Sequence, residues 1–168
     1  MRPDRKIFLI GMPGSGKSFL GKELAAKLSL PFIDLDDAIV TKIGMPIADY
    51  FTKEGQSAFR RIEKDTLTEI ISTHDEFVMA TGGGAPCFFD NLTLMKGSGL
   101  TLYLETPKEV LIERNLQSDE RPLMRGDVEK TIAEMLKTRL STYQKAHLII
   151  QDPDTQSLIP GINQFFKN

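Results

Sequence analysis

A glycine-rich loop near the start of the chain constrains the fold more than any other segment. Residues 11–18 read Gly-Met-Pro-Gly-Ser-Gly-Lys-Ser and match the pattern G-x-x-x-x-G-K-[ST] at each fixed position. The apolar run Ile7–Ile10 precedes this loop, and a helical pattern begins at Lys17. A strand before and a helix after are the context that this pattern requires, so the segment predicts a phosphate-binding loop. The alternative is a glycine-rich turn that carries an incidental Lys-Ser pair.

The residue types of this loop suit a nucleoside triphosphate. Glycines allow backbone N–H groups to surround phosphate oxygens, and the amino end of the following helix adds a favourable dipole. Lys17 is expected to reach the β- and γ-phosphates, and the Ser18 hydroxyl is expected to bind Mg²⁺. The loop therefore predicts ATP or a close relative as the phosphate donor and leaves the acceptor open. The loop residues expected at the nucleotide are Gly14, Ser15, Gly16, Lys17, Ser18 and Phe19.

Short apolar runs alternate with longer helical patterns along the whole chain, without a repeat or a long linker. This alternation predicts an α/β fold around a parallel sheet, in which ligands collect at the carboxyl ends of the strands. The expected strands are Ile7–Ile10, Phe32–Leu35, Phe77–Ala80, Leu100–Leu104 and Leu148–Ile150. The expected helices are Lys17–Leu28, Asp37–Ile43, Ile47–Lys53, Ser57–Ser72, Pro107–Leu116, Val128–Tyr143 and, roughly, Gln156–Phe166.

Composition narrows the classes of function. A chain of 168 residues fits one hydrophobic core. Its net charge of −2 and the lack of a Lys/Arg run argue against nucleic-acid binding. The four apolar residues before Gly11 are too few for a signal peptide or a membrane span, and the single Cys87 cannot form an internal disulfide. We therefore expect one domain over residues 1–168, a cytoplasmic monomer, and no nucleic-acid or membrane partner.

Two aspartates follow the second expected strand. Side chains alternate across a strand, so Asp34 and Asp36 are expected on the same side of the sheet edge. Two carboxylates beside a phosphate loop suit a shared task, in which one holds the magnesium shell and the other engages a hydroxyl acceptor. The alternative role is a helix N-cap, which we assign to Asp37.

Two arginines are candidates for binding an anionic acceptor. Arg139 falls within the apolar stripe of the helix expected over Val128–Tyr143, where an arginine is costly unless it is paired or faces a polar cavity. It can snorkel to solvent, pair with a buried carboxylate, or face a ligand cleft. Arg60 could form an ordinary surface pair with Glu63, three residues further on. Because a guanidinium matches a carboxylate through two parallel hydrogen bonds, two converging arginines would indicate a carboxylated acceptor.

Two other segments fit a phosphate-transfer site. Three consecutive glycines, residues 82–84, follow the third expected strand; they favour backbone lying against a ligand, although a plain flexible turn also fits. Arg121 follows a helix in a polar stretch, which suits either a lid over the phosphates or a solvated loop. His74 and His147 lack partners at metal-binding or catalytic spacing, so we expect both to be structural.

The motifs stand in a distinctive order: Gly11–Ser18, Asp34-Leu35-Asp36, Phe51–Gly55, Phe59–Glu63, Gly82–Gly84, Arg121-Pro122-Leu123 and Arg139–Tyr143. Together they resemble the shikimate kinases, within the nucleoside-monophosphate-kinase-like branch of phosphate-loop proteins, over nearly the whole chain. The resemblance implies a five-stranded parallel sheet of order 2-3-1-4-5 flanked by helices, a shikimate-binding region at about 35–62 and a lid at about 114–126. It also implies Mg²⁺-dependent transfer of the γ-phosphoryl of ATP to the 3-hydroxyl of shikimate, on the way to chorismate and the aromatic amino acids.

The resemblance implies roles for individual residues on the acceptor side. Shikimate would lie against Asp36, Arg60, Gly83 and Arg139, with the two arginines at its carboxylate and Asp36 at its ring hydroxyls. The sequence departs from the family after Arg139, where Leu-Ser-Thr stands in a position that often holds proline and leucine before the tyrosine. The arginine itself is retained, so the expected substrate is unchanged.

On the donor side the resemblance implies one Mg²⁺ ion, with Ser18 as a direct ligand and Asp34 in the outer shell. Lys17 and the lid residue Arg121 would neutralise the phosphates, and Asp36 would complete the catalytic set. Arg114 would stack near the adenine, which Gln156 would also touch.

Two rival functions remain open from the sequence. A different small-metabolite kinase, such as a gluconate kinase, would share the phosphate loop and the fold. A nucleotide-binding module without catalysis would bind ATP and phosphorylate nothing.

Overall fold

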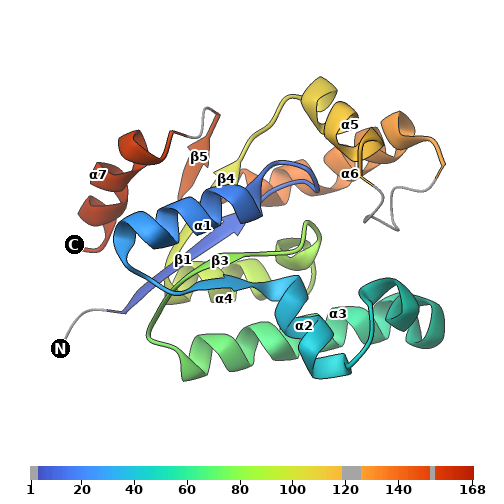
Figure 1. Cartoon of the computed structure of the whole chain (residues 1–168), viewed down its shortest axis with the longest axis horizontal. Helices are drawn as coiled ribbons and strands as arrows, with labels where there is room; N and C mark the ends of the chain where they lie inside the picture. The colour runs from blue at the N-terminus through green and yellow to red at the C-terminus, as the bar shows by residue number, and fades with distance from the viewer. Residues whose placement is uncertain (1–3, 119–125, 152–153) are drawn as a thin grey trace.

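Five parallel strands form a central sheet, and helices cover both of its faces (Figure 1). The computed structural model describes residues 4–118, 126–151 and 154–168. The strand order β2-β3-β1-β4-β5 confirms the order implied by the resemblance. The strands are β1 (Arg5–Ile10), β2 (Phe32–Asp34), β3 (Glu76–Ala80), β4 (Leu100–Leu104) and β5 (Leu148–Ile150).

The helices divide between the two faces of the sheet. One face is covered by α1 (Lys17–Leu28) and α7 (Thr155–Phe165), which contribute Leu24 and Ile162 to its core. The helices of the other face are α2 (Leu35–Ile43), α3 (Ile47–Thr73), α4 (Asn91–Ser98), α5 (Lys108–Leu116) and α6 (Val128–Tyr143). Within the described ranges, no helix has the length and apolar character needed to cross a bilayer.

The central strand β1 supplies both cores. Successive side chains of a strand face opposite sides, so Phe8 and Ile10 enter the core under α2–α6 while Ile7 and Leu9 enter the core under α1 and α7. All four side chains are fully buried. An apolar run without polar alternation is what a strand covered on both faces requires.

The strand order brings three loops to one edge of the sheet. β3 lies between β2 and β1, so the segments that follow these three strands meet at their carboxyl ends. Thr81, directly after β3, donates from its backbone N–H (3.1 Å) and its hydroxyl (2.9 Å) to the carbonyl of Leu9. The glycine triplet is thereby held beside the glycine-rich loop that follows β1.

The predicted elements agree with the structure except at a few places. The segments expected as Ile47–Lys53 and Ser57–Ser72 form one element, α3, interrupted by a non-helical residue at Gly55. The second strand ends at Asp34 and not at Leu35. Helix α4 and a short 3₁₀ helix over Ala85–Cys87 were not expected. The sequence of α4 gives little amphipathic signal, because only Asn91 and Met95 of its eight residues are buried.

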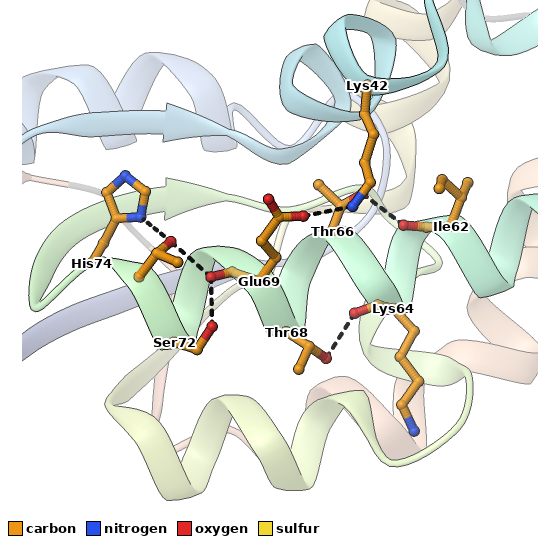
Figure 2. A network of polar contacts seen from close by, with 9 residues as sticks. Lys42, Ile62, Lys64, Thr66, Thr68, Glu69, Ser72 and His74 are labelled. Carbon is orange, nitrogen blue, oxygen red and sulfur yellow. Dashed lines mark hydrogen bonds and ion pairs between the residues drawn. The ribbon is translucent and has the colours of Figure 1, made fainter.

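Helices α2 and α3 lie side by side and are joined on their outer surface by a polar contact (Figure 2). Lys42 of α2 donates a hydrogen bond to Glu69 of α3 at 2.5 Å, which lowers the pKa of the Glu69 carboxyl. Both groups face solvent, where salt screens such pairs, so the apolar side chains Leu35 and Ile39 beneath them carry the packing. This packing fixes α2 against the helix that carries Arg60.

Replacing Gly55 by alanine tests the break in α3. Gly55 has φ 84° and ψ 173°, a region that residues with a Cβ atom scarcely occupy. We expect Gly55→Ala to lower the free energy of unfolding by about 1–3 kcal/mol, measured by urea denaturation.

Gly97→Ala is the matched control, because Gly97 lies inside α4 and an added Cβ atom there meets no atom within 4 Å. This change should raise the unfolding free energy by about 0.4–1 kcal/mol. An unchanged stability of Gly55→Ala would contradict the assigned strain.

Candidate functional site

The loop at residues 11–18 is wrapped around the amino group of Lys17. Its Nζ donates to the carbonyl oxygens of Gly11 at 2.8 Å and Met12 at 2.9 Å, and the side chain is buried. Gly11, Gly14 and Gly16 have positive φ angles, which let the backbone close around the amine. The loop thus places a buried cation at the amino end of α1, where the helix dipole also favours an anion.

Helix α5 braces the loop from outside. Arg114 donates from Nη1 to the carbonyl of Gly14 at 2.9 Å, and Asn115 donates from Nδ2 to the carbonyl of Pro13 at 3.0 Å. The structure therefore places Arg114 at the loop itself, and its expected contact with adenine stays a prediction. The contribution of Asn115 was not expected from the sequence, because an asparagine in a helix carries no pattern of its own.

Ser18 and Asp34 are brought together as the sequence analysis expected. The Ser18 hydroxyl donates to Oδ2 of Asp34 at 2.9 Å. The other oxygen, Oδ1, accepts from the backbone N–H groups of Asp36 (3.0 Å) and Asp37 (3.4 Å) and so caps α2. The N-cap is therefore Asp34, and the assignment of this role to Asp37 was wrong, because the strand ends one residue earlier than expected.

A hydroxyl and a carboxylate beside a phosphate loop are hard oxygen ligands of the kind that Mg²⁺ prefers. In the described part of the chain, no group of three or more His, Cys, Asp or Glu side chains is placed to hold a metal ion. The Ser18 hydroxyl fits as a direct ligand of an ion that takes its remaining ligands from phosphate and water, as Mg²⁺ commonly does, and Asp34 is placed to bind the outer shell through Ser18 or water.

Asp36 lies in the first turn of α2, so the expected alternation with Asp34 along a strand was wrong. It nonetheless lies at the site, because a Cβ atom added at Gly82 would stand 3.0 Å from its Oδ1 and the charges of Lys17 and Arg60 both act on its carboxyl. Burial raises the pKa of the Asp36 carboxyl above its ordinary value, and the charge of Asp34 adds to this rise, whereas Lys17 and Arg60 oppose it. A half-buried carboxylate held between charges of both signs can accept a hydrogen bond from a hydroxyl group.

Arg60 is buried, and its pair with Glu63 lies inside the protein. Nη1 of Arg60 donates to Oε1 of Glu63 at 2.8 Å, and these side chains are 6% and 1% exposed. An ordinary surface pair was therefore the wrong expectation for these two residues. Burial raises the pKa of the Glu63 carboxyl, while the charge and hydrogen bond of Arg60 oppose the rise. The spacing of three residues was visible in the sequence, but the burial of Glu63 was not.

Two aromatic rings flank the Arg60 guanidinium. Its central carbon lies 4.1 Å from the ring centre of Phe88 and 5.2 Å from that of Phe59. Such cation–π contacts stabilise a desolvated arginine. Among the described atoms, Nε of Arg60 is buried without a hydrogen-bond partner, so the guanidinium retains capacity for an anionic ligand.

The glycine triplet lies directly against these side chains. A Cβ atom added at Gly84 would stand 2.5 Å from Nη2 of Arg60, and one added at Gly83 would stand 3.1 Å from Nη1 of Arg139. At Gly82 it would meet Oδ1 of Asp36 at 3.0 Å and Oε2 of Glu63 at 3.3 Å. Residues 82–84 are thus backbone packed against a ring of charged side chains, and not a plain turn.

Arg139 faces this ring from α6. It is half-buried, and its charge acts on both Glu63 and Cys87. Snorkelling to solvent therefore does not apply, and the side chain of Arg139 lies beside the backbone of Gly83. The four residues expected at the acceptor, Asp36, Arg60, Gly83 and Arg139, converge on one place.

Of the remaining residues expected at the nucleotide, two are exposed and one lies outside the described residues. Phe19 is 73% exposed on the first turn of α1, and Gln156 is exposed on the first turn of α7. Arg121, with most of the proposed lid, lies outside the described residues.

The two histidines that were expected to be structural have protein partners. Nδ1 of His147 accepts from the backbone N–H of Thr101 at 3.1 Å. His74 lies with Nδ1 3.2 Å from the carbonyl of Ile70. Burial raises the pKa of the Cys87 thiol, which disfavours the nucleophilic thiolate.

Comparison with known proteins decides the family. The family model described as Shikimate kinase matches residues 13–167. The chain belongs to the shikimate kinase family. The shikimate kinase of Azobacteroides pseudotrichonymphae is 42% identical over 150 residues, which cover 86% of this chain and 88% of that protein.

Solved structures of shikimate kinases agree with the fold over nearly the full length. The enzyme from Bacteroides thetaiotaomicron superposes with a TM-score of 0.87 at 32% identity, covering 98% of this chain and 99% of the other. The enzyme from Acinetobacter baumannii, solved in complex with shikimate, gives 0.86 at 35% identity and covers 95% and 91%. A gluconokinase from Sinorhizobium meliloti reaches 0.61 at 17% identity and shares the fold alone, covering 100% of this chain and 97% of its own.

The raised pKa of Asp36 predicts how the pH affects stability. The folded state binds the Asp36 proton more tightly than the unfolded state, so ionised Asp36 costs stability at pH 7. Asp36→Asn removes this cost, and we expect the variant to unfold at a higher temperature than the wild type at pH 7. The difference should shrink as the pH falls toward 3.8, the ordinary value for this group, because the wild-type carboxyl then becomes protonated as well.

Asp37→Asn is the control for this comparison, since exposed Asp37 lies in the same helical turn and reports the loss of a charge at the helix dipole. Thermal unfolding of both variants at pH 7 and pH 4 decides the question. An Asp36→Asn chain less stable than Asp37→Asn at pH 7 would contradict the assigned desolvation.

Proposed function

We propose that this protein transfers the γ-phosphoryl group of ATP to the 3-hydroxyl of shikimate and forms shikimate 3-phosphate. The observation that carries the proposal is the convergence of Asp36, Arg60 and Arg139 on the glycine triplet, beside a phosphate-binding loop. Membership of the shikimate kinase family supports it. The reaction belongs to the route to chorismate and the aromatic amino acids.

The acceptor side suits a small molecule that carries one carboxylate and several hydroxyls. Arg60 and Arg139 hold the carboxylate, because a guanidinium can donate two parallel hydrogen bonds to it. Glu63 holds one edge of Arg60, and the flanking rings restrict the remaining motion. The arginine is thus preorganised, which lowers the entropic cost of binding.

Asp36 binds the reacting side of the acceptor. It orients the attacking hydroxyl and accepts its proton late, since phosphoryl transfer passes a loose transition state that needs positioning more than a strong base. Gly83 gives the acceptor a close approach to backbone.

The donor side neutralises the phosphates. Lys17 moves its amine from the loop carbonyls to the β- and γ-phosphate oxygens, and Arg121 adds a second positive charge. Ser18 would be a direct ligand of one Mg²⁺ ion with Asp34 in its outer shell, and the ion would screen the negative charge of the phosphates. Phe19, Arg114 and Gln156 complete the nucleotide site.

We further propose that the region of about 35–62 forms the shikimate-binding part and about 114–126 the lid of a single domain. The protein acts as a cytoplasmic monomer without nucleic-acid or membrane partners. The net charge of −2 and the lack of a basic run support the absence of a nucleic-acid partner.

A coupled assay of ADP release tests the function against both rivals. We expect turnover with ATP, Mg²⁺ and shikimate, and none with gluconate or without an acceptor. Chelation of Mg²⁺ should abolish turnover. Asp36→Asn serves as the control, since it should bind ATP normally and lose turnover. Phosphorylation of gluconate, or ATP binding with no phosphorylated product, would replace the proposal with the corresponding rival.

Arg139→Lys tests the carboxylate clamp. Lysine keeps the charge but loses the planar fork, so we expect the KM for shikimate to rise about tenfold, the loss of roughly one charge-assisted hydrogen bond. The KM for ATP should stay unchanged. The matched control is Arg61→Lys, at an exposed position on α3, which should leave both constants as in the wild type. Equal increases of both KM values in Arg139→Lys would place this arginine outside the acceptor site.

A further inference from the structure

A buried tyrosine lies between the phosphate-binding loop at residues 11–18 and the glycine triplet at residues 82–84. Tyr143, the last residue of α6, is fully buried. Its hydroxyl donates a hydrogen bond to the carbonyl of Gly83 at 2.5 Å and lies 4.0 Å from Sδ of Met12 in the phosphate-binding loop. One phenol oxygen therefore contacts the glycine triplet and the loop that wraps Lys17.

The ring of Tyr143 is held in place by a second tyrosine. Its plane stacks on that of Tyr103 with ring centres 5.1 Å apart and an interplanar angle of 27°. Tyr103, near the end of β4, lies beside the phosphate-binding loop: a Cβ atom added at Gly11 would stand 3.6 Å from its Cδ2. Buried aromatic rings with two torsion angles are rigid, so the direction of the hydroxyl is fixed by packing.

The contact with Gly83 matters because the backbone there has no side chain to hold it. Three consecutive glycines have a wide choice of conformations, and each costs entropy to order. A peptide group is planar, so a fixed Gly83 carbonyl also fixes the N–H of Gly84. These are the residues against which Arg60 and Arg139 pack.

We infer that Tyr143 is a positioning residue: its hydroxyl fixes the Gly83–Gly84 peptide and thereby the surface on which the acceptor binds. The inference deepens the proposed function and rests on it. Tyr143 does not touch the reacting atoms in this role. It acts through the backbone of residues 83 and 84 and through its proximity to Arg139, one helical turn earlier.

The hydroxyl is suited to a permanent donor role. Burial raises the pKa of Tyr143 well above its usual range, which the charge of Arg139 opposes only in part. The hydroxyl therefore remains protonated at neutral pH and donates to the carbonyl of Gly83.

Tyr143→Phe tests the inference, because it removes the hydroxyl and keeps the ring. We expect the KM for shikimate to rise about fivefold, the loss of roughly one neutral hydrogen bond, while the KM for ATP stays within about twofold of the wild type. Tyr103→Phe is the matched control: it also removes a phenol oxygen from the stacked pair, and it leaves the hydrogen bond of the Tyr143 hydroxyl to Gly83 in place. Both KM values of the control should remain near those of the wild type.

A second measurement does not depend on catalysis. Backbone hydrogen exchange of residues 82–84 should become faster in Tyr143→Phe than in the wild type and Tyr103→Phe, with the exchange of β1 unchanged.

An unchanged exchange rate at 82–84 would overturn the inference, as would an unchanged KM for shikimate. A parallel rise of both KM values, or a loss of stability that extends to β1, would also overturn it, because the hydroxyl would then support the fold in general. A wild-type protein that does not phosphorylate shikimate would refute the proposed function, whereas the exchange comparison would still report on the position of Gly83.

Discussion

The parallel pairing of β1 with β3 is the constraint on which the site depends. Both strands end at the same edge of the sheet, and Thr81 ties the end of β3 to Leu9 through two hydrogen bonds. The loop that wraps Lys17 and the glycine triplet therefore lie next to each other, although about seventy residues separate them in the chain. A phosphate donor and an acceptor can meet only because two neighbouring strands point in the same direction.

Electrostatics determines what the acceptor side can hold. Arg60, Arg139, Asp36 and Glu63 gather around the backbone of residues 82–84, where burial raises the pKa values of both carboxyl groups. A buried arginine is costly without a partner, and Glu63 supplies that partner while Nε of Arg60 has none among the described atoms. Glu63 thus compensates part of the cost of burying the positive charge of Arg60. The Nε group that has no partner leaves Arg60 able to bind an anion.

Much of this arrangement could be predicted from the sequence, for physical reasons. The phosphate-binding loop is a local pattern, in which residue type, spacing and flanking elements are all visible in one segment. The five strands are short apolar runs, which the requirement for burial on both faces makes conspicuous. The acceptor residues were predicted through the resemblance to a family, and the structure brings them together at the glycine triplet.

The features that the sequence did not reveal depend on tertiary contacts or on single-residue boundaries. Asp34 caps α2 because the second strand ends one residue earlier than expected. The spacing of apolar residues in a sequence does not locate the end of an element to within one residue. Burial of Glu63 depends on how α3 packs against the glycine triplet, and the spacing of three residues fits an exposed pair equally well. The contact of Tyr143 with Gly83 joins residues sixty positions apart, which no local pattern encodes.

The carboxylate of Asp34 divides its two oxygens between two tasks. Oδ1 holds the amino end of α2, and Oδ2 accepts from Ser18. A ligand that draws the Ser18 hydroxyl away would leave the cap in place, so α2 and the acceptor residue that it carries need not unwind when the donor side rearranges. The two halves of the cleft thus share one carboxylate, and each of its oxygens serves a different half.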